Sequence, residues 1–216
     1  MVSNNSIKLA ANRATHAYWA VKDMIRQRQL HGGEIIVESR LAAALDVSRT
    51  PLREALQRLE GEGLVVKTAN HSFLVRKVDL AEYLNSLSAR LLLEVEAVGL
   101  AIDRIPGAAI AAARSEIHAL MEAAEFDREA HWRSDNHVHG LIADACGNPV
   151  LAQLIRSLRV TTNLFEIERV ADRIEPDSTE HLKLLDALEA RDSKGAKLAM
   201  RRHINSLKNH ATRSMV

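Results

Sequence analysis

Residues that break helices are scarce in this chain. Its 216 residues include nine glycines and four prolines, whereas an all-β protein needs turn residues roughly every 8 to 12 positions. After residue 79, apolar side chains recur every three or four residues, as at Leu84, Leu87, Leu91 and Val95, which is the spacing of one face of an α-helix. The sequence therefore predicts a mainly α-helical protein.

The second part of the chain, residues 78–216, contains a series of such apolar stripes. We expect helices near residues 84–102, 108–125, 128–145, 149–168, 179–190 and 193–212. Long amphipathic helices that are joined by short connections bury their apolar faces against one another. These residues are therefore predicted to form an all-α antiparallel bundle.

Residues 1–77 show a different order of elements. A helix whose apolar stripe starts at Ala17 ends before Gly32 and Gly33, and a short extended segment follows at residues 35–37. After it come two helices joined by a tight turn and two strands around a polar tip. These elements are expected at residues 38–45, about 50–61, 64–67 and 73–76. Pro51 is tolerated in the first turn of the second short helix, where Ser48 or Thr50 can cap the exposed amides. The pattern predicts a small domain of helices followed by a β-hairpin.

Charge is distributed unevenly between the two parts. The whole chain carries 29 Lys and Arg against 28 Asp and Glu, a net charge of +1 with histidine neutral. Residues 1–76 carry 11 basic and 7 acidic side chains, and residues 77–216 carry 18 and 21. A basic head joined to a mildly acidic body indicates one domain that binds a polyanion and another with a different task.

Composition argues against several other classes of protein. Seven aromatic residues are too few for the stacking platforms that bind single-stranded nucleic acid. The single cysteine, Cys146, cannot form an intrachain disulfide and offers no thiolate cluster for a metal. No apolar run reaches the roughly 18 residues of a membrane span, and the chain starts without a signal-like segment. We therefore expect a cytoplasmic protein with no membrane partner.

Two short helices joined by a tight turn, the second with arginines near its amino end, are suited to reading the major groove of DNA. The segments ESRLA at 38–42, VSRTPLREALQRL at 47–59 and GLV at 63–65 resemble the winged helix-turn-helix of GntR-family transcription regulators. The resemblance implies DNA contacts by Arg40, Ser48, Arg49, Thr50 and Arg53, and by Asn70 and His71 at the tip of the wing. Asp46 stands where the family's turn usually has glycine, and aspartate tolerates the left-handed conformation.

Histidines of the body fall on apolar helical stripes. Asp135 and His139 lie one turn apart within one stripe, and His181 and His203 each share a stripe with apolar residues. A single buried histidine is usually a hydrogen-bonded core residue, but burying all four groups without a common partner is costly. We therefore expect Asp135, His139, His181 and His203 to bind one divalent metal ion. Three imidazoles and a carboxylate suit zinc first, with nickel, manganese and iron(II) as alternatives.

The same region resembles the C-terminal effector domain, called FCD, of FadR-type GntR regulators. The segments that carry the resemblance are DNHVH at 135–139, EHLKLLDA at 180–187 and AMRRHI at 199–204. Metal-binding members of that family place Asp and three His at these four positions, and an arginine of the first body helix binds an effector carboxylate. Arg90 matches that arginine.

The resemblance implies a homodimeric repressor that binds a pseudo-palindromic operator in double-stranded DNA and responds to a small carboxylic acid. It assigns residues 1–77 to the winged helix-turn-helix domain and 78–216 to an all-helical domain for effector binding and dimerisation. A bound metal with an open coordination position would accept a carboxylate of the effector, and Arg90 would supply a second anchor.

Other interpretations use the same residues. The metal could be purely structural in a regulator that acts through protein contacts. Three histidines and a carboxylate could instead activate water in a metal-dependent hydrolase, but the sequence offers no identifiable general base on a catalytic loop. Arg90 and Glu94, one turn apart, could form an ordinary surface ion pair. The regulator interpretation predicts that the protein is not an enzyme.

Overall fold

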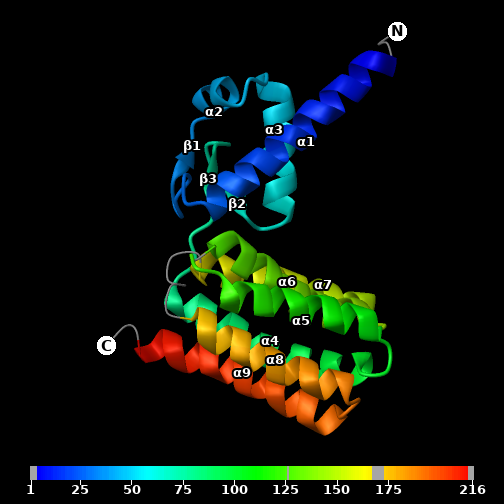
Figure 1. Ribbon diagram of the computed structural model, residues 1–216. Coiled ribbons are helices and arrows are strands. Elements are labelled where there is room, and N and C mark those ends of the chain that lie inside the picture. The colour runs from blue at the N-terminus through cyan, green and yellow to red at the C-terminus, as the bar shows by residue number, and fades with distance from the viewer. Residues whose placement is uncertain (1–3, 126, 167–172, 214–216) are drawn as a thin grey trace. The chain divides into compact units, whose positions relative to one another are not determined.

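The computed structural model describes residues 4–125, 127–166 and 173–213, and these residues form nine helices and three short strands (Figure 1). The prediction of a mainly helical protein is confirmed. The chain divides into two compact units: the described residues up to Val78 with 163–166, and the remaining described residues from Asp79 onward. Each unit buries its own set of apolar side chains.

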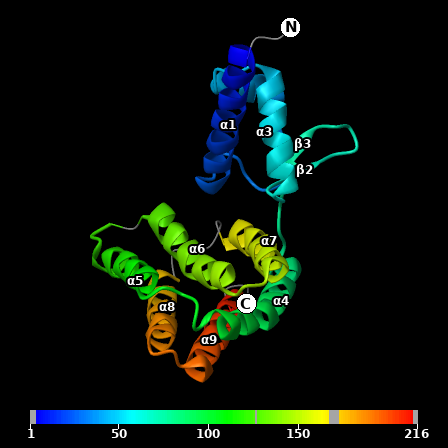
Figure 2. The ribbon, with the colours of Figure 1, turned by 90° about the vertical axis from the view of Figure 1, so that its right-hand side faces the viewer.

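The first unit contains three helices and a small sheet. The helices are α1 (Asn4–Arg26), α2 (Glu38–Ala44) and α3 (Arg49–Gly61), and the strands are β1 (Ile35–Ile36), β2 (Val65–Lys67) and β3 (Phe73–Val75). β3 lies in the middle of the antiparallel sheet, whose strand order is β1-β3-β2. The β2–β3 hairpin extends away from α1 and α3 (Figure 2). These features confirm the winged helix-turn-helix and add β1, where only an extended segment was expected.

Two details of the first unit differ from the expectations. α1 starts at Asn4, well before the apolar stripe that begins at Ala17, because the intervening sequence is rich in alanine, which favours helices. Ser48 is the N-cap residue of α3, but its side chain makes no capping hydrogen bond. The expectation that it caps the helix is therefore wrong, and its exposed hydroxyl remains at the surface. Asp46, in the turn before α3, takes the left-handed conformation expected of it, with a φ of 51°.

Leucines of α3 form the centre of the core in the first unit. Leu52, Leu56 and Leu59 are completely buried, and this face of α3 packs along α1. Because the leucines are spaced by three or four residues, the opposite face of α3 stays exposed. Arg49 and Arg53 lie on that exposed face.

The helices that follow Asp79 confirm the predicted all-α body. They are α4 (Leu80–Ala101), α5 (Gly107–Glu122), α6 (Arg128–Ala145), α7 (Pro149–Glu166), α8 (Ile174–Glu189) and α9 (Ser193–Arg213). α4 packs along α9 and α6, and α8 packs along α9 and α5. α8 starts earlier than the predicted residue 179, because Pro176 is compatible with the first turn of a helix. The predicted end of α7, at residue 168, lies outside the described residues.

The interior of the body is not purely apolar. Leucine, isoleucine, valine and alanine side chains fill most of it, but Arg90, Glu94, His139, His181 and His203 are each no more than 2% exposed. Within the described residues, no helix combines the length and the apolar character that crossing a membrane requires.

Substituting the core of the first unit should destabilise it. Leu56→Ala leaves a cavity between α3 and its neighbours, and we expect the free energy of unfolding to fall by about 2–5 kcal/mol. Urea denaturation followed by circular dichroism measures this change. The exposed neighbour Gln57→Ala is the matched control and should change stability by less than about 0.5 kcal/mol. Equal stabilities of the two variants would contradict the assigned orientation of α3.

Candidate metal centre and DNA-binding face

Four side chains from three helices converge in the interior of the body. Asp135 and His139 lie one turn apart on α6, His181 comes from α8 and His203 from α9. One ligand atom from each residue lies within 4.8 Å of the other three. The Nε2 atoms of His139 and His181 are 3.4 Å apart, and they lie 3.6 and 3.7 Å from Oδ1 of Asp135. The residues singled out in the sequence thus meet at one point.

The chemistry of these atoms fits a metal ion. His139, His181 and His203 are almost completely buried, and Nε2 of His203 has no hydrogen-bond partner among the residues that the structure describes. Buried nitrogen atoms are rarely left unpaired in proteins. A cation bound between the four side chains would give this nitrogen a partner. Three imidazoles and one carboxylate form a donor set for a divalent transition metal.

Two glutamates form hydrogen bonds with the imidazole rings of His139 and His203, on the side away from the clustered Nε2 atoms. Glu94 on α4 is hydrogen-bonded to Nδ1 of His139, and Oε2 of Glu180 on α8 lies 2.9 Å from Nδ1 of His203. When Nδ1 donates to a carboxylate, the lone pair of Nε2 is free to face a metal, and the ring is fixed in orientation. Neither role was assigned from the sequence.

Arg90 lies next to Glu94, one of these two glutamates. Its Nε is 2.5 Å from Oε1 of Glu94, and its Nη1 is 3.0 Å from Oγ1 of Thr162 on α7. Both members of the Arg90–Glu94 pair are about 1% exposed, so the alternative of a surface ion pair is wrong. The pair is buried because the stripe that includes Leu87 and Val98 faces the interior. Through Glu94, Arg90 is connected to His139.

A second buried arginine was not anticipated from the sequence. Nη2 of Arg159 on α7 lies 2.5 Å from Oδ2 of Asp135 and 2.9 Å from Oδ1 of Asn136, whereas its Nη1 is buried and has no hydrogen-bond partner in the described part of the chain. Arg159 shares a helical face with Ile155 and Thr162, which are completely buried. An arginine within such a face is the signal that could have identified it.

The buried charges favour the protonation states that bind metal. Burial, assisted by the guanidinium of Arg159, lowers the pKa of His139 from 6.5 to about 4. Burial and the neighbouring His203 lower the pKa of His181 well below 6.5. Burial raises the pKa of Asp135, but Arg159 and His139 outweigh this effect and hold that pKa well below 3.8. Near neutral pH the two imidazoles are uncharged and the carboxylate is ionised.

A second group of candidate ligands overlaps the first. Asp177, Glu180 and His203 are also close enough to share an ion. However, both carboxylates form ion pairs with Arg173, and Oε2 of Glu180 is also in contact with Nδ1 of His203. This group therefore forms the layer behind His203, not a separate metal site.

The residues assigned to DNA contact are all exposed on the first unit. They are Arg40 on α2, Ser48 before α3, Arg49, Thr50 and Arg53 on α3, and Asn70 and His71 at the hairpin tip. Nε of Arg53 lies 2.6 Å from Oε2 of Glu38, an ion pair that joins α3 to the start of α2. Arg58 is placed differently, since its guanidinium lies 3.8 Å from the centre of the Tyr18 ring on α1.

Two known protein families match this chain. Residues 13–75 match the family described as bacterial regulatory proteins, gntR family, and residues 85–206 match the FCD domain. The Nta operon transcriptional regulator of Aminobacter aminovorans is 36% identical over 126 residues, which are 58% of this chain and 60% of that protein. The probable D-xylose utilization operon transcriptional repressor of Paenarthrobacter nicotinovorans is 28% identical over 182 residues, 83% of this chain and 80% of that protein. The solved structure of E. coli McbR/YncC covers all of both chains with a TM-score of 0.78 at 22% identity.

A winged helix-turn-helix joined to this helical body defines a DNA-binding transcription regulator and not an enzyme. The chain belongs to the GntR family of bacterial regulatory proteins and carries an FCD domain.

The carboxylate behind His203 should strengthen metal binding. We expect Glu180→Ala to weaken zinc affinity by about 10- to 100-fold, because the ring of His203 loses its hydrogen bond and its fixed orientation. Competition with a chromophoric chelator measures the affinity. Glu116→Ala is the matched control, since Oε2 of Glu116 makes the same 2.9 Å contact with Nδ1 of His137 away from the cluster. Equal affinities in both variants would contradict this role of Glu180.

The metal-free protein should lose stability as the pH falls below neutral. In the unfolded chain His139 takes up a proton near pH 6.5, but in the folded chain it does so only near pH 4. The unfolded state therefore binds more protons in this window, and stability decreases with falling pH by up to about 1.4 kcal/mol per unit for each such histidine. Urea denaturation in the presence of EDTA at pH 7, 6 and 5 measures this slope. His139→Gln should reduce the slope, and an unchanged slope would contradict the assignment.

Proposed function

We propose that this regulator is a homodimeric repressor of the FadR type, whose affinity for a pseudo-palindromic operator is controlled by a small organic acid. The acid binds in the helical body beside a divalent metal ion, with zinc as the first candidate. The observation that carries the proposal is the buried cluster of Asp135, His139, His181 and His203, in which Nε2 of His203 has no partner within the described residues.

The four clustered side chains would hold the ion, which supplies a positive charge and a coordination position for a carboxylate oxygen. Glu94 and Glu180 keep two of the imidazoles in the binding orientation by accepting from Nδ1. With the ion bound, the buried donors and acceptors of the cluster are satisfied.

The buried arginines indicate an acidic effector. Nη1 of Arg159 is buried and has no hydrogen-bond partner within residues 4–125, 127–166 and 173–213, and its Nη2 donates a hydrogen bond to Asp135. Arg90 lies on the other side of His139, bound to Glu94. A guanidinium binds a carboxylate through two parallel hydrogen bonds. A small carboxylic acid would therefore take one anchor from the ion and another from Arg90 or Arg159.

On the first unit, Arg40, Ser48, Arg49, Thr50 and Arg53 would contact the major groove, and Asn70 and His71 would reach the DNA from the wing. A dimer supplies two such faces, which matches an operator with two half-sites. Repression is supported by relatives of this chain that are named as repressors. A regulator that binds chromosomal DNA acts in the cytoplasm.

The effector can change operator affinity only if it binds the DNA-competent and DNA-incompetent dimers with different affinities. A coupling free energy of about 1–3 kcal/mol, which corresponds to roughly 5- to 150-fold in affinity, is ordinary for such regulators. The effector is a ligand of the body, so its effect must reach the first unit through a change in the population of two states of the dimer.

The acid response should depend on the metal cluster. A DNA fragment selected in vitro with the purified, zinc-loaded protein serves as the operator, and acids are first chosen from a panel by thermal shift. We expect the selected acid to weaken operator binding by about 5-fold or more, measured by fluorescence anisotropy. The double variant His139→Ala/His181→Ala should bind the same DNA but lose this response.

His137→Ala is the matched control, because His137 lies on the same helix but pairs with Glu116 at the surface. It should keep the acid response. An unchanged response in the double variant would exclude the metal-mediated mechanism. A large loss of thermal stability on chelation, without any effect of acids on DNA binding, would show that the metal is purely structural.

A further inference from the structure

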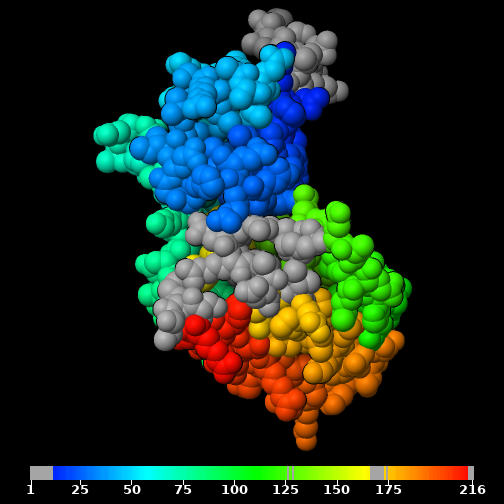
Figure 3. Space-filling model, turned by 60° about the vertical axis from the view of Figure 1, so that its left-hand side comes forward, coloured from blue at the N-terminus to red at the C-terminus, as the bar shows by residue number. Residues whose placement is uncertain are grey.

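We propose that a pocket on α9, separate from the metal cluster, binds the phosphate group of a small molecule. The pocket is lined by Arg173, Arg202, Asn205, Ser206, Asn209, His210 and Arg213 and has a volume of about 440 Å³. We call it the α9 pocket. It lies along the last two helices, whose surfaces adjoin in Figure 3. Its existence does not depend on the effector site proposed above.

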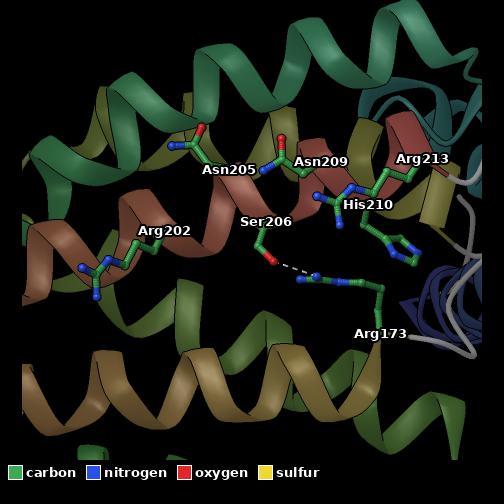
Figure 4. A pocket seen from close by; sticks show the side chains of 7 residues that line it. All are labelled: Arg173, Arg202, Asn205, Ser206, Asn209, His210 and Arg213. Carbon is green, nitrogen blue, oxygen red and sulfur yellow. Dashed lines mark hydrogen bonds between the residues drawn. The ribbon is translucent and has the colours of Figure 1, made fainter.

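The lining follows one face of α9. Six of the seven residues recur at three- or four-residue intervals from Arg202 to Arg213, and Arg173 approaches from the start of α8 (Figure 4). At 1.5 Å per residue this face is roughly 16 Å long. A phosphate group occupies only a part of this length. The pocket therefore has room for the organic part of a phosphate monoester as well, and its volume lies in the range of small-molecule sites.

The charge of the lining is positive. None of the seven residues is acidic, and Arg202 and Arg213 form no ion pair within the described part of the chain. Guanidinium groups attract anions and bind phosphate oxygens through directed hydrogen bonds. The side-chain amides of Asn205 and Asn209 add neutral donors to the same face.

Arg173 gives the pocket a buried side chain of fixed orientation in addition to its exposed arginines. Its side chain is only 9% exposed, and its orientation is fixed by Asp177 and Glu180 and by a 2.8 Å hydrogen bond from Nη1 to Oγ of Ser206. Its Nε, however, is buried and has no hydrogen-bond partner among the described residues. Arg173 is thus a rigidly held part of the wall of a pocket that has no acidic residue in its lining.

Phosphate fits this set of donors better than a carboxylate does. Asp177 and Glu180 already neutralise Arg173, so the attraction depends on Arg202 and Arg213, while Arg173 and the amides provide direction. A phosphate monoester carries close to two negative charges and three acceptor oxygens at neutral pH, whereas a carboxylate has one charge and two oxygens. The number of donors and cations matches the phosphate.

The experiment uses the full-length protein stripped of metal with EDTA, so that phosphate cannot bind through an ion at the histidine cluster. Isothermal titration calorimetry in chloride buffer measures the binding of inorganic phosphate and of glycerol 3-phosphate. We expect saturable binding of at least one of them. Tighter binding of glycerol 3-phosphate identifies a phosphate monoester as the ligand, and equal binding identifies free phosphate; either result supports the pocket.

Arg213→Gln should weaken this binding about tenfold, and Arg202→Gln/Arg213→Gln by more, because each loses a charge-assisted hydrogen bond. Both side chains are exposed, and circular dichroism checks that the variants remain folded. Arg201→Gln is the matched control, since Arg201 is an exposed arginine of α9 that does not line the pocket. It should leave the affinity unchanged.

Three results would overturn the proposal. They are the absence of saturable binding of either compound, equal weakening by Arg201→Gln, and loss of binding in His139→Ala/His181→Ala with the pocket intact. The last result would place the anion at the histidine cluster. Because no metal, acid or DNA is used, a negative result here leaves the operator experiment unaffected, and a failed operator experiment leaves this one unaffected.

Discussion

Compensation of buried charge is the constraint on which the helical body depends. Arg90, Glu94, Asp135 and Arg159 lie in its interior together with three histidines, where an isolated charge would cost several kcal/mol. Each charge has an opposite charge within hydrogen-bonding distance, in two pairs at 2.5 Å. The energy of such pairs largely offsets the cost of desolvation and adds little net stability. Their effect is to fix how the helices are rotated about their axes, because any rotation would leave a charge unpaired.

The clustered ligands and the buried charges around them come from most helices of the body. α6, α8 and α9 provide the four clustered ligands, α4 provides Glu94 and Arg90, and α7 provides Arg159. Of the body helices in the described chain, only α5 contributes none of these residues. A ligand or ion at this point therefore contacts, directly or through one side chain, nearly every helix of the body. This arrangement is suited to a domain in which binding at one site must alter the packing of the whole.

The prediction from sequence succeeded where helical periodicity carries the information. Three histidines and an aspartate on apolar stripes predicted the cluster, because residues on the inner faces of packed helices must approach one another. The same logic failed for Glu94 and Arg159. Charged residues are usually exposed, and only the contacts between helices show which opposite charges Glu94 and Arg159 are paired with inside the body. Strand β1 and the Arg53–Glu38 pair were also not predicted, since each depends on a partner distant in sequence.

The pair between Arg53 and Glu38 bears on the DNA contact that we propose for Arg53. Oε2 of Glu38, on the neighbouring helix, accepts a hydrogen bond from Nε of the guanidinium at 2.6 Å. The two Nη groups could donate two parallel hydrogen bonds to a base edge while Nε keeps its carboxylate. A side chain already held by a neighbouring helix would lose less rotational freedom on binding DNA, so Glu38 would favour the contact without touching the DNA itself.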